Sequence, residues 1–297
     1  MLDYKLVEAF AAVISEGGFE KGARMLHLTQ GAVSQRVKLL EEQAGCVLLV
    51  RSSPPRPTEA GRDMLRHYRQ VRRLEEDLSA GAGRNREGFD TLAVGVNADS
   101  LATWFFPAVN SYLDAEPVLL DLSVDDQAET LKLLKAGEVI GCVSDRADPV
   151  QGCRVEYLGD MDYRLYGSAS YKMKWYPDGL TLRAAERAPI LVFNRKDIMH
   201  EALLAEALGE RPALRAPFYL PSSEKFPEAV ASGRVSGMLP DQQADPGLKR
   251  GELVDLLPGR IFTVRLHWHC WNLESARLTG FTDALVRAAR SLLVQRP

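Results

Sequence analysis

The chain has 297 residues, 46% hydrophobic and 26% charged, which is enough for two or three domains with buried cores. No apolar run approaches the roughly 20 residues that cross a bilayer, and no export signal opens the chain, so we expect a cytoplasmic protein without a membrane partner. The formal net charge of −3 excludes attraction of nucleic acid by the whole surface.

The charge is unevenly distributed along the chain. Residues 1–73 hold 12 Lys and Arg against 8 Asp and Glu, so the excess of positive charge lies at the N-terminus. The four cysteines are scattered and lack C-x-x-C spacing, which favours free thiols over a disulfide framework or a zinc ribbon.

Three short helices are predicted at the N-terminus. Residues 4–15 carry apolar side chains three or four positions apart, as in an amphipathic helix. A second helix is predicted at 19–26 and a third at about 30–43, where Thr29 provides the N-cap. Two helices joined by a turn at 27–29 are typical of a helix-turn-helix, whose second helix lies in the major groove of DNA.

The third helix and the stretch after it hold candidate DNA contacts. Gln is suited to a bidentate contact with adenine, whereas Arg and Lys favour guanine or phosphate. The following "VLLVRSSPPRPT" predicts a strand, a proline-stiffened turn and a returning strand, as in a wing with phosphate-binding arginines. An ordinary solvated helix face is the alternative. The candidate DNA-binding residues are Thr29, Gln30, Ser34, Gln35, Arg36, Lys38, Arg51 and Arg56.

A long helix is predicted from Thr58 to about residue 82. Its spacing of four and three residues is that of a short coiled coil, which favours a dimer seam over packing on its own domain. The seam positions are Ala60, Met64, His67, Val71, Leu74 and Leu78. The Gly-rich and charged stretch 79–88 is predicted to be a linker.

Strands and helices alternate after the linker, which predicts a parallel sheet with crossover helices. The strand "FTVRLHWHCW" and the helix at 277–294 would complete the first of two such sets, giving two lobes around a cleft. The predicted fold is therefore α/β with an N-terminal all-α winged helix-turn-helix. The predicted domains are 1–58 for DNA binding, 59–88 for dimerisation and hinge, and 89–297, with lobe 1 at about 89–162 and 264–297 and lobe 2 at about 163–263.

Two acidic motifs follow strands of the first lobe. Asp99 and Ser100 stand where a helix begins, and free N–H groups there could seat the α-carboxylate of an amino acid, with Ser100 as a further donor. Asp125 and Asp126 end the next strand, where adjacent carboxylates could hold an ammonium or guanidinium group. Helix capping is the alternative for both pairs.

Further cleft candidates follow from topology, because ligands of such sheets bind outside the carboxyl ends of the strands. These candidates are Ser144, Ser222, Ser223 and Trp268. His267 and His269 lie on one face of a strand, but no further ligand stands near them in sequence, so we expect no metal site. No nucleophile elbow, P-loop or zinc-protease motif occurs, and we expect neither an enzyme nor a cofactor.

The stretch "FEKGARMLHLTQGAVSQRVKLLEEQAGCVLLVR" with "PPRPTEAG" resembles the N-terminal signature of the LysR-type transcriptional regulators, and the resemblance covers nearly the whole chain. One departure is Gly31, where the family often has Pro or Ser. "VNADSLATW", "MHEALL", "SSEKFPEAVASG" and "LVDLLPG" are similar to the arginine- and lysine-responsive branch, also described as inhibitors of chromosome replication initiation.

The resemblance implies a homodimer or homotetramer that binds promoter DNA, senses lysine or arginine, works with RNA polymerase and controls amino acid export or related genes. It also strengthens the interpretation of Asp125 and Asp126 as ligand contacts. Two alternatives stay open: binding to a replication origin without transcriptional control, and a stand-alone amino acid binding module. The second predicts an export signal and no basic helical N-terminus, whereas this sequence has the reverse pattern.

Overall fold

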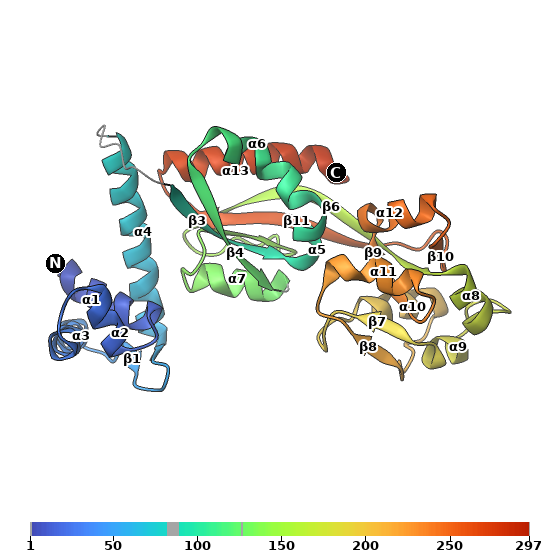
Figure 1. The fold of residues 1–297 in the computed structure, drawn as a ribbon, viewed down its shortest axis with the longest axis horizontal. Helices are drawn as coiled ribbons and strands as arrows, with labels where there is room; N and C mark the ends of the chain where they lie inside the picture. Colours follow the sequence, from blue (N-terminus) through green and yellow to red (C-terminus); the bar gives the residue numbers. More distant parts are fainter. Residues whose placement is uncertain (1, 82–88, 126, 297) are drawn as a thin grey trace.

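The computed structural model describes residues 2–81, 89–125 and 127–296. A small helical unit lies at the N-terminal end, a long helix rises from it, and an elongated two-lobed α/β unit extends to the side (Figure 1). None of the helices in these ranges is both long and apolar enough to span a membrane.

The N-terminal unit is a winged helix-turn-helix. Its elements are α1 (Tyr4–Ser15), α2 (Phe19–Met25), α3 (Gln30–Ala44), β1 (Leu49–Val50) and β2 (Arg56–Pro57). Apolar residues from all three helices, among them Phe10, Ala23 and Val37, are buried together in one core. The predicted N-cap of α3 is confirmed: the Thr29 hydroxyl accepts a hydrogen bond of 3.2 Å from the Ala32 amide.

The wing and the long helix α4 (Glu59–Gly81) are joined through Thr58. Its hydroxyl donates to the Val47 carbonyl at 2.8 Å and accepts from the Gly61 amide at 3.1 Å, so one side chain fastens the wing and caps the helix. Along the predicted seam of α4, Met64 packs against the winged core, whereas Leu74 and Leu78 are exposed. The large apolar seam residues that are exposed therefore lie in the second half of α4.

The other half of the chain contains a nine-stranded sheet in the order β4-β3-β5-β11-β6-β9-β7-β8, with β10 beside β6. Strands β3, β4 and β5 run parallel, while β11 and β6 run antiparallel to their neighbours and pass through both lobes (Figure 1). The predicted fold class, an α/β two-lobed unit behind a winged helix-turn-helix, is confirmed.

The elements of lobe 1 are β3 (Asp90–Asn97), α5 (Ala98–Ser100), the π-helical turn η1 (Leu101–Phe105), α6 (Phe106–Ala115), β4 (Val118–Asp125), α7 (Gln127–Lys135), β5 (Gly141–Ser144) and α13 (Ala276–Leu292). The two strands shared with lobe 2 are β6 (Cys153–Gly167) and β11 (Phe262–Trp271). Helix α13 packs on α6 of lobe 1.

The elements of lobe 2 are α8 (Ala169–Trp175), α9 (Leu182–Arg187), β7 (Ile190–Val192), α10 (Met199–Leu208), β8 (Pro217–Tyr219), the 3-10 turn η2 (Ser223–Lys225), α11 (Phe226–Ala231), β9 (Ser236–Pro240), α12 (Asp241–Lys249) and β10 (Val254–Asp255). The sequence pattern did not predict α12, because Pro246 lies inside it and Gly247 follows. The helix forms because Ala244 and Gly247 are buried when it packs on β6 and β9.

Candidate functional site

The exposed side of α3 forms a candidate DNA interface. Val33, Val37 and Leu40 are fully buried and fasten the helix to α1 and α2. The polar positions between these residues, such as Gln30 and Gln35, are exposed along the helix. The arrangement therefore leaves amide groups on the solvent side of the second helix of the helix-turn-helix, where base edges are read.

Cationic side chains flank this helix. The Lys38 ammonium lies 3.7 Å from the Glu42 carboxylate, and its side chain remains 72% exposed. In the wing, the Arg51 guanidinium lies 5.7 Å from the centre of the Phe19 ring, and Arg56 is exposed on β2. Of the other candidates, Ser34 and Arg36 are half-buried. The structure thus gathers the predicted DNA-binding residues on α3, its cap and the wing.

A second candidate site lies between the two lobes, where Asp99 of α5 meets lobe 2. Its carboxylate accepts a hydrogen bond from the Tyr163 hydroxyl at 2.7 Å and another from the Ser223 hydroxyl of η2. Ser223 in turn accepts from the Gln243 amide of α12 at 3.0 Å. Three segments that are far apart in the sequence are therefore joined at one carboxylate.

Burial raises the pKa of Asp99, although the hydrogen bonds from Ser223 and Tyr163 act in the opposite direction. The carboxylate of Asp197, which follows β7 in lobe 2, also raises the pKa of Asp99 by repulsion. Asp197 itself accepts hydrogen bonds from the Phe193 and Met199 amides, both at 3.1 Å. Two carboxylates from opposite lobes thus create a negative region, which favours a cationic ligand.

Buried polar atoms around Asp99 have no hydrogen-bond partner among the described residues. They are Asn97 Oδ1, Ser100 Oγ and Gln243 Oε1. Asn97 and Ser100 flank Asp99 in the sequence, and Gln243 reaches it through Ser223. Because buried polar groups are normally paired, these atoms indicate a place where a polar ligand or water binds.

His200 at the start of α10 is also buried, and neither of its ring nitrogens has a partner among the described residues. Burial lowers its pKa to about 4, so the ring is neutral at pH 7. A neutral ring adds no positive charge to this part of lobe 2, which preserves the preference for a cation.

Other predicted cleft residues also lie at strand ends. Asn97 is paired in register with Asp125, and Ser144 ends β5, so the ends of three strands meet at one edge. Asp125 is exposed, whereas Ser144 is buried and accepts a hydrogen bond of 3.3 Å from the Arg146 amide. Ser222 is half-buried beside η2. Asp126 lies outside the described residues.

The prediction that Trp268 lines the cleft is wrong. Its side chain is fully buried in the core of lobe 1, where Nε1 donates to the Thr282 hydroxyl of α13 at 3.1 Å. The nearby His269 is buried as well, and its Nε2 lies 2.7 Å from the Arg146 carbonyl oxygen. These contacts give both residues a structural role on the strand they share.

Tyr163, Asp197 and Gln243 were not predicted from the sequence. Asp197 carries the same signal that singled out Asp99, since it stands between the end of a strand and the start of a helix. Tyr163 lies inside a strand and Gln243 inside a helix that the pattern did not predict, so neither had a usable signal.

Comparisons with known proteins agree with this architecture. Residues 4–62 match the bacterial regulatory helix-turn-helix protein, lysR family, and residues 85–290 match the LysR substrate binding domain. The HTH-type transcriptional regulator ArgP of Pseudomonas aeruginosa is 42% identical over 297 residues, covering 99% of this chain and 98% of that protein.

Two solved structures are similar over essentially the whole chain. ArgP from Mycobacterium tuberculosis has a TM-score of 0.91 at 37% identity and covers 100% of both chains. Full-length LysG from Corynebacterium glutamicum, with bound effector Arg, has a TM-score of 0.82 at 36% identity and covers 99% of this chain and 100% of that one.

The fold and its two sites define a DNA-binding regulator with a separate two-lobed unit. The chain belongs to the LysR family of bacterial regulatory helix-turn-helix proteins. Its similarity to the arginine- and lysine-responsive branch is confirmed by the ArgP relatives and by LysG. These relatives are named as transcriptional regulators, which also confirms the expectation that the protein is not an enzyme.

Proposed function

We propose that this regulator binds promoter DNA through α3 and the wing, and that its interlobe cleft senses a basic amino acid, arginine or lysine. The observation that carries the ligand is the Asp99 carboxylate, which the hydroxyls of Tyr163 and Ser223 hold between the lobes. The negative charge of Asp197 in lobe 2 raises the pKa of this carboxylate further. The bound arginine of the LysG structure, a relative of similar length, supports the same ligand class.

The cleft offers separate groups for the parts of such a ligand. Asp99 is suited to an ammonium group, because a cation would offset the cost of its buried charge. Asp197 in lobe 2, or Asp125 beside Asn97 in lobe 1, would attract a guanidinium or a second ammonium. The hydroxyl of Ser100, which is buried and has no partner among the residues that the structure describes, would donate to the α-carboxylate. This scheme needs an effector and no cofactor.

The effector would act by stabilising one arrangement of the lobes. Asp99 contacts Ser223 across the cleft, so a cation at Asp99 changes the energy of lobe closure. A ligand shifts such an equilibrium only through its different affinities for the two arrangements. We propose that two copies of the chain associate through the exposed seam residues Leu74 and Leu78 of α4. Closure of the lobes would then move the paired winged helices on promoter DNA in the cytoplasm, where RNA polymerase binds.

Two substitutions distinguish contacts with DNA bases from contacts with DNA phosphates. Gln35→Ala should weaken binding to the specific site about tenfold and leave binding to unrelated DNA unchanged, because an amide reads base edges. Arg51→Ala should weaken both about equally and lower the salt slope by about one, because it removes one phosphate contact. Fluorescence anisotropy over a series of KCl concentrations measures both effects.

Arg183→Ala, which removes an exposed arginine of α9 in lobe 2, is the control and should change neither affinity nor salt slope. If Gln35→Ala weakened all DNA equally, the assignment of α3 to base reading would be wrong.

A gel-shift titration tests the function as a whole. The DNA is the intergenic region upstream of the gene, and the titration is run at moderate salt with no effector, with arginine and with lysine. We expect a specific shift whose affinity or mobility changes with at least one of these amino acids. The absence of a specific shift would contradict the regulator proposal, and a shift indifferent to both amino acids would contradict only the effector.

A further inference from the structure

The two lobes are connected through the crossing strands β6 and β11, which pair antiparallel along most of their length. The register of this pair shifts between Leu266 and His267, opposite Gly159. Gly159 has φ of 141°, a value that side-chain-bearing residues rarely adopt. The irregularity marks the place where the crossing strands can bend, as hinges do at a few residues.

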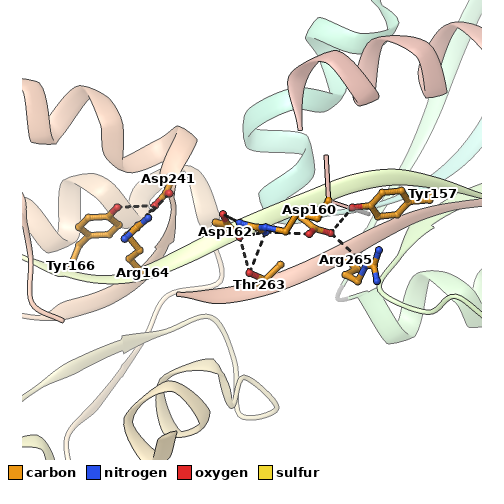
Figure 2. Close-up of polar contacts among 9 residues, drawn as sticks. Tyr157, Asp160, Asp162, Arg164, Tyr166, Asp241, Thr263 and Arg265 are labelled. Carbon is orange, nitrogen blue, oxygen red and sulfur yellow. Dashed lines mark hydrogen bonds and ion pairs between the residues drawn. The ribbon is translucent and has the colours of Figure 1, made fainter. Parts of the chain in front are cut away.

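Two buried carboxylates lie directly beside this point. Asp160 and Asp162 are only 3% and 8% exposed, and they lie two residues apart on β6, on the same face. Asp160 accepts a hydrogen bond from the Tyr157 hydroxyl at 2.7 Å, and Asp162 accepts one from the Thr263 hydroxyl at 2.7 Å (Figure 2). Two like charges so close together need a cation between them.

Two arginines supply positive charge here. Arg265 Nε lies 3.6 Å from Asp160, whereas Arg296 contacts both carboxylates. Its Nη1 donates to Asp160 at 3.1 Å and to Asp162 at 2.8 Å, while its Nη2 donates to the second oxygen of Asp162 at 2.6 Å. These hydrogen bonds hold the pKa of Asp162 below its usual range. Backbone hydrogen bonds also join β6 to the segment after α13. The Asp160 amide donates to the Val294 carbonyl at 2.8 Å, and the Val294 amide donates to the Asp160 carbonyl at 3.2 Å.

The first turn of α12 connects this region to the cleft. Asp241 accepts hydrogen bonds from Arg164 at 3.1 Å and from Tyr166 at 2.8 Å, both on β6 (Figure 2). Gln242 donates to the Leu292 carbonyl of lobe 1 at 3.1 Å. Gln243 donates to Ser223, the partner of Asp99. Three consecutive side chains thus contact a crossing strand, the end of α13 and the cleft.

We propose that Val294–Arg296 clamps the interlobe hinge and, together with the first turn of α12, positions lobe 2 over Asp99. The consequence for ligand affinity rests on the proposed function of the cleft. With the clamp in place the crossing strands are held in one arrangement, so Ser223 stays in reach of the Asp99 carboxylate. Without it, Asp162 loses both Arg296 hydrogen bonds and Asp160 keeps Arg265 as its cationic contact, so the two carboxylates repel each other more strongly. The lobes then sample more orientations, which lowers the fraction competent to bind.

Hydrogen exchange of the full-length protein without effector tests the clamp directly. In Arg296→Ala, amides at 158–163 and 262–266 should exchange about tenfold faster, the factor expected when charge-assisted hydrogen bonds are lost. Peptides covering 97–105 and 220–226, at the cleft, should also exchange faster. Arg296→Lys keeps the positive charge but cannot donate two parallel hydrogen bonds to one carboxylate. Its exchange rates should therefore lie between those of wild type and Arg296→Ala.

The matched control is Arg290→Ala. Arg290 lies on α13, donates to the Tyr157 carbonyl at 3.0 Å and contacts Glu156 at 3.1 Å, so it binds β6 without touching Asp160 or Asp162. Its removal should leave exchange at the hinge and the cleft unchanged. Unchanged hinge exchange in Arg296→Ala would overturn the clamp, and faster hinge exchange with an unchanged cleft would overturn the positioning of lobe 2.

Calorimetric titration with arginine provides the second measurement. Affinity should fall at least about fivefold in Arg296→Ala and stay unchanged in Arg290→Ala, because only the first lowers the competent fraction. Equal affinity in wild type and Arg296→Ala would contradict the role of the clamp in binding. If wild type bound neither arginine nor lysine, the proposed effector would be wrong, while the exchange experiment would still decide the clamp.

Discussion

Asp99→Asn is expected to abolish the response to arginine and lysine while making the protein without ligand more stable. The amide keeps the size of the side chain and can still accept from Tyr163, but it cannot pair with a cation. Losing one partner of a buried charged pair costs at least about 2 kcal/mol, or roughly thirtyfold in affinity. Calorimetric titration measures the affinity, and the gel shift measures the response.

The gain in stability follows from the sign of the pKa shift. Burial raises the pKa of Asp99 in the folded protein, so the ionised carboxylate opposes folding at pH 7. As the pH falls through the raised folded pKa towards the unfolded value, the wild-type residue takes up a proton and this penalty disappears. The difference in melting temperature between Asp99→Asn and wild type should therefore be largest at pH 7 and should disappear in acid.

Asp121→Asn is the control, because Asp121 is an exposed carboxylate on β4 of the same lobe. It should alter neither arginine affinity nor the pH dependence of melting. An Asp99→Asn variant that bound arginine as tightly as wild type would remove Asp99 from the effector site. A variant that melted below wild type at pH 7 would show that its hydrogen bonds outweigh the cost of the buried charge.

Gly61→Ala is expected to destabilise the winged unit by at least about 2 kcal/mol, through overpacking at the junction with α4. A Cβ atom at Gly61 would lie 2.0 Å from the Leu48 carbonyl oxygen and 3.1 Å from Cζ of Phe10. The same carbonyl accepts a hydrogen bond of 3.0 Å from the Thr58 amide. Relieving the clash therefore moves the wing or the first turn of α4.

The sequence provides a way to separate the two halves of the protein in this experiment. All four tryptophans lie beyond residue 103, so their fluorescence reports the two-lobed unit, whereas far-ultraviolet circular dichroism reports every helix. In Gly61→Ala, part of the dichroism signal should melt at lower temperature while the fluorescence transition stays in place. Specific DNA binding should fall with the loss of the winged unit.

Gly31→Ala is the matched control for stability, because a Cβ atom at Gly31, on the exposed face of α3, would meet no atom of the described residues within 4 Å. Its melting should equal or slightly exceed that of wild type, since Ala has the higher helix propensity. Unchanged melting of Gly61→Ala would mean that the junction between wing and α4 yields without cost.

Much of the winged unit could be predicted from the sequence because its determinants are local. The apolar spacing of α1 and α3, the hydroxyl of Thr29 and the proline-rich turn of the wing act within a few residues of one another. The alternation of strands and helices likewise indicated two lobes, and it placed Asp99 at a strand end. Apolar periodicity and capping hydrogen bonds involve residues only a few positions apart, so they can be predicted from the sequence.

The tertiary structure alone decided which of these residues meet. Asp99 and Ser223 are separated by 124 positions, and no local pattern pairs them. Trp268 had the strand position of a cleft residue, yet packing against α13 buried it. The sequence by itself determined most helices and strands and the cap of α3, since short-range forces form them, whereas α12 depends on packing against β6 and β9. Packing between distant segments determined the carboxylate pair of the cleft and the Arg296 contacts at the hinge, because burial and charge pairing act through space and not along the chain.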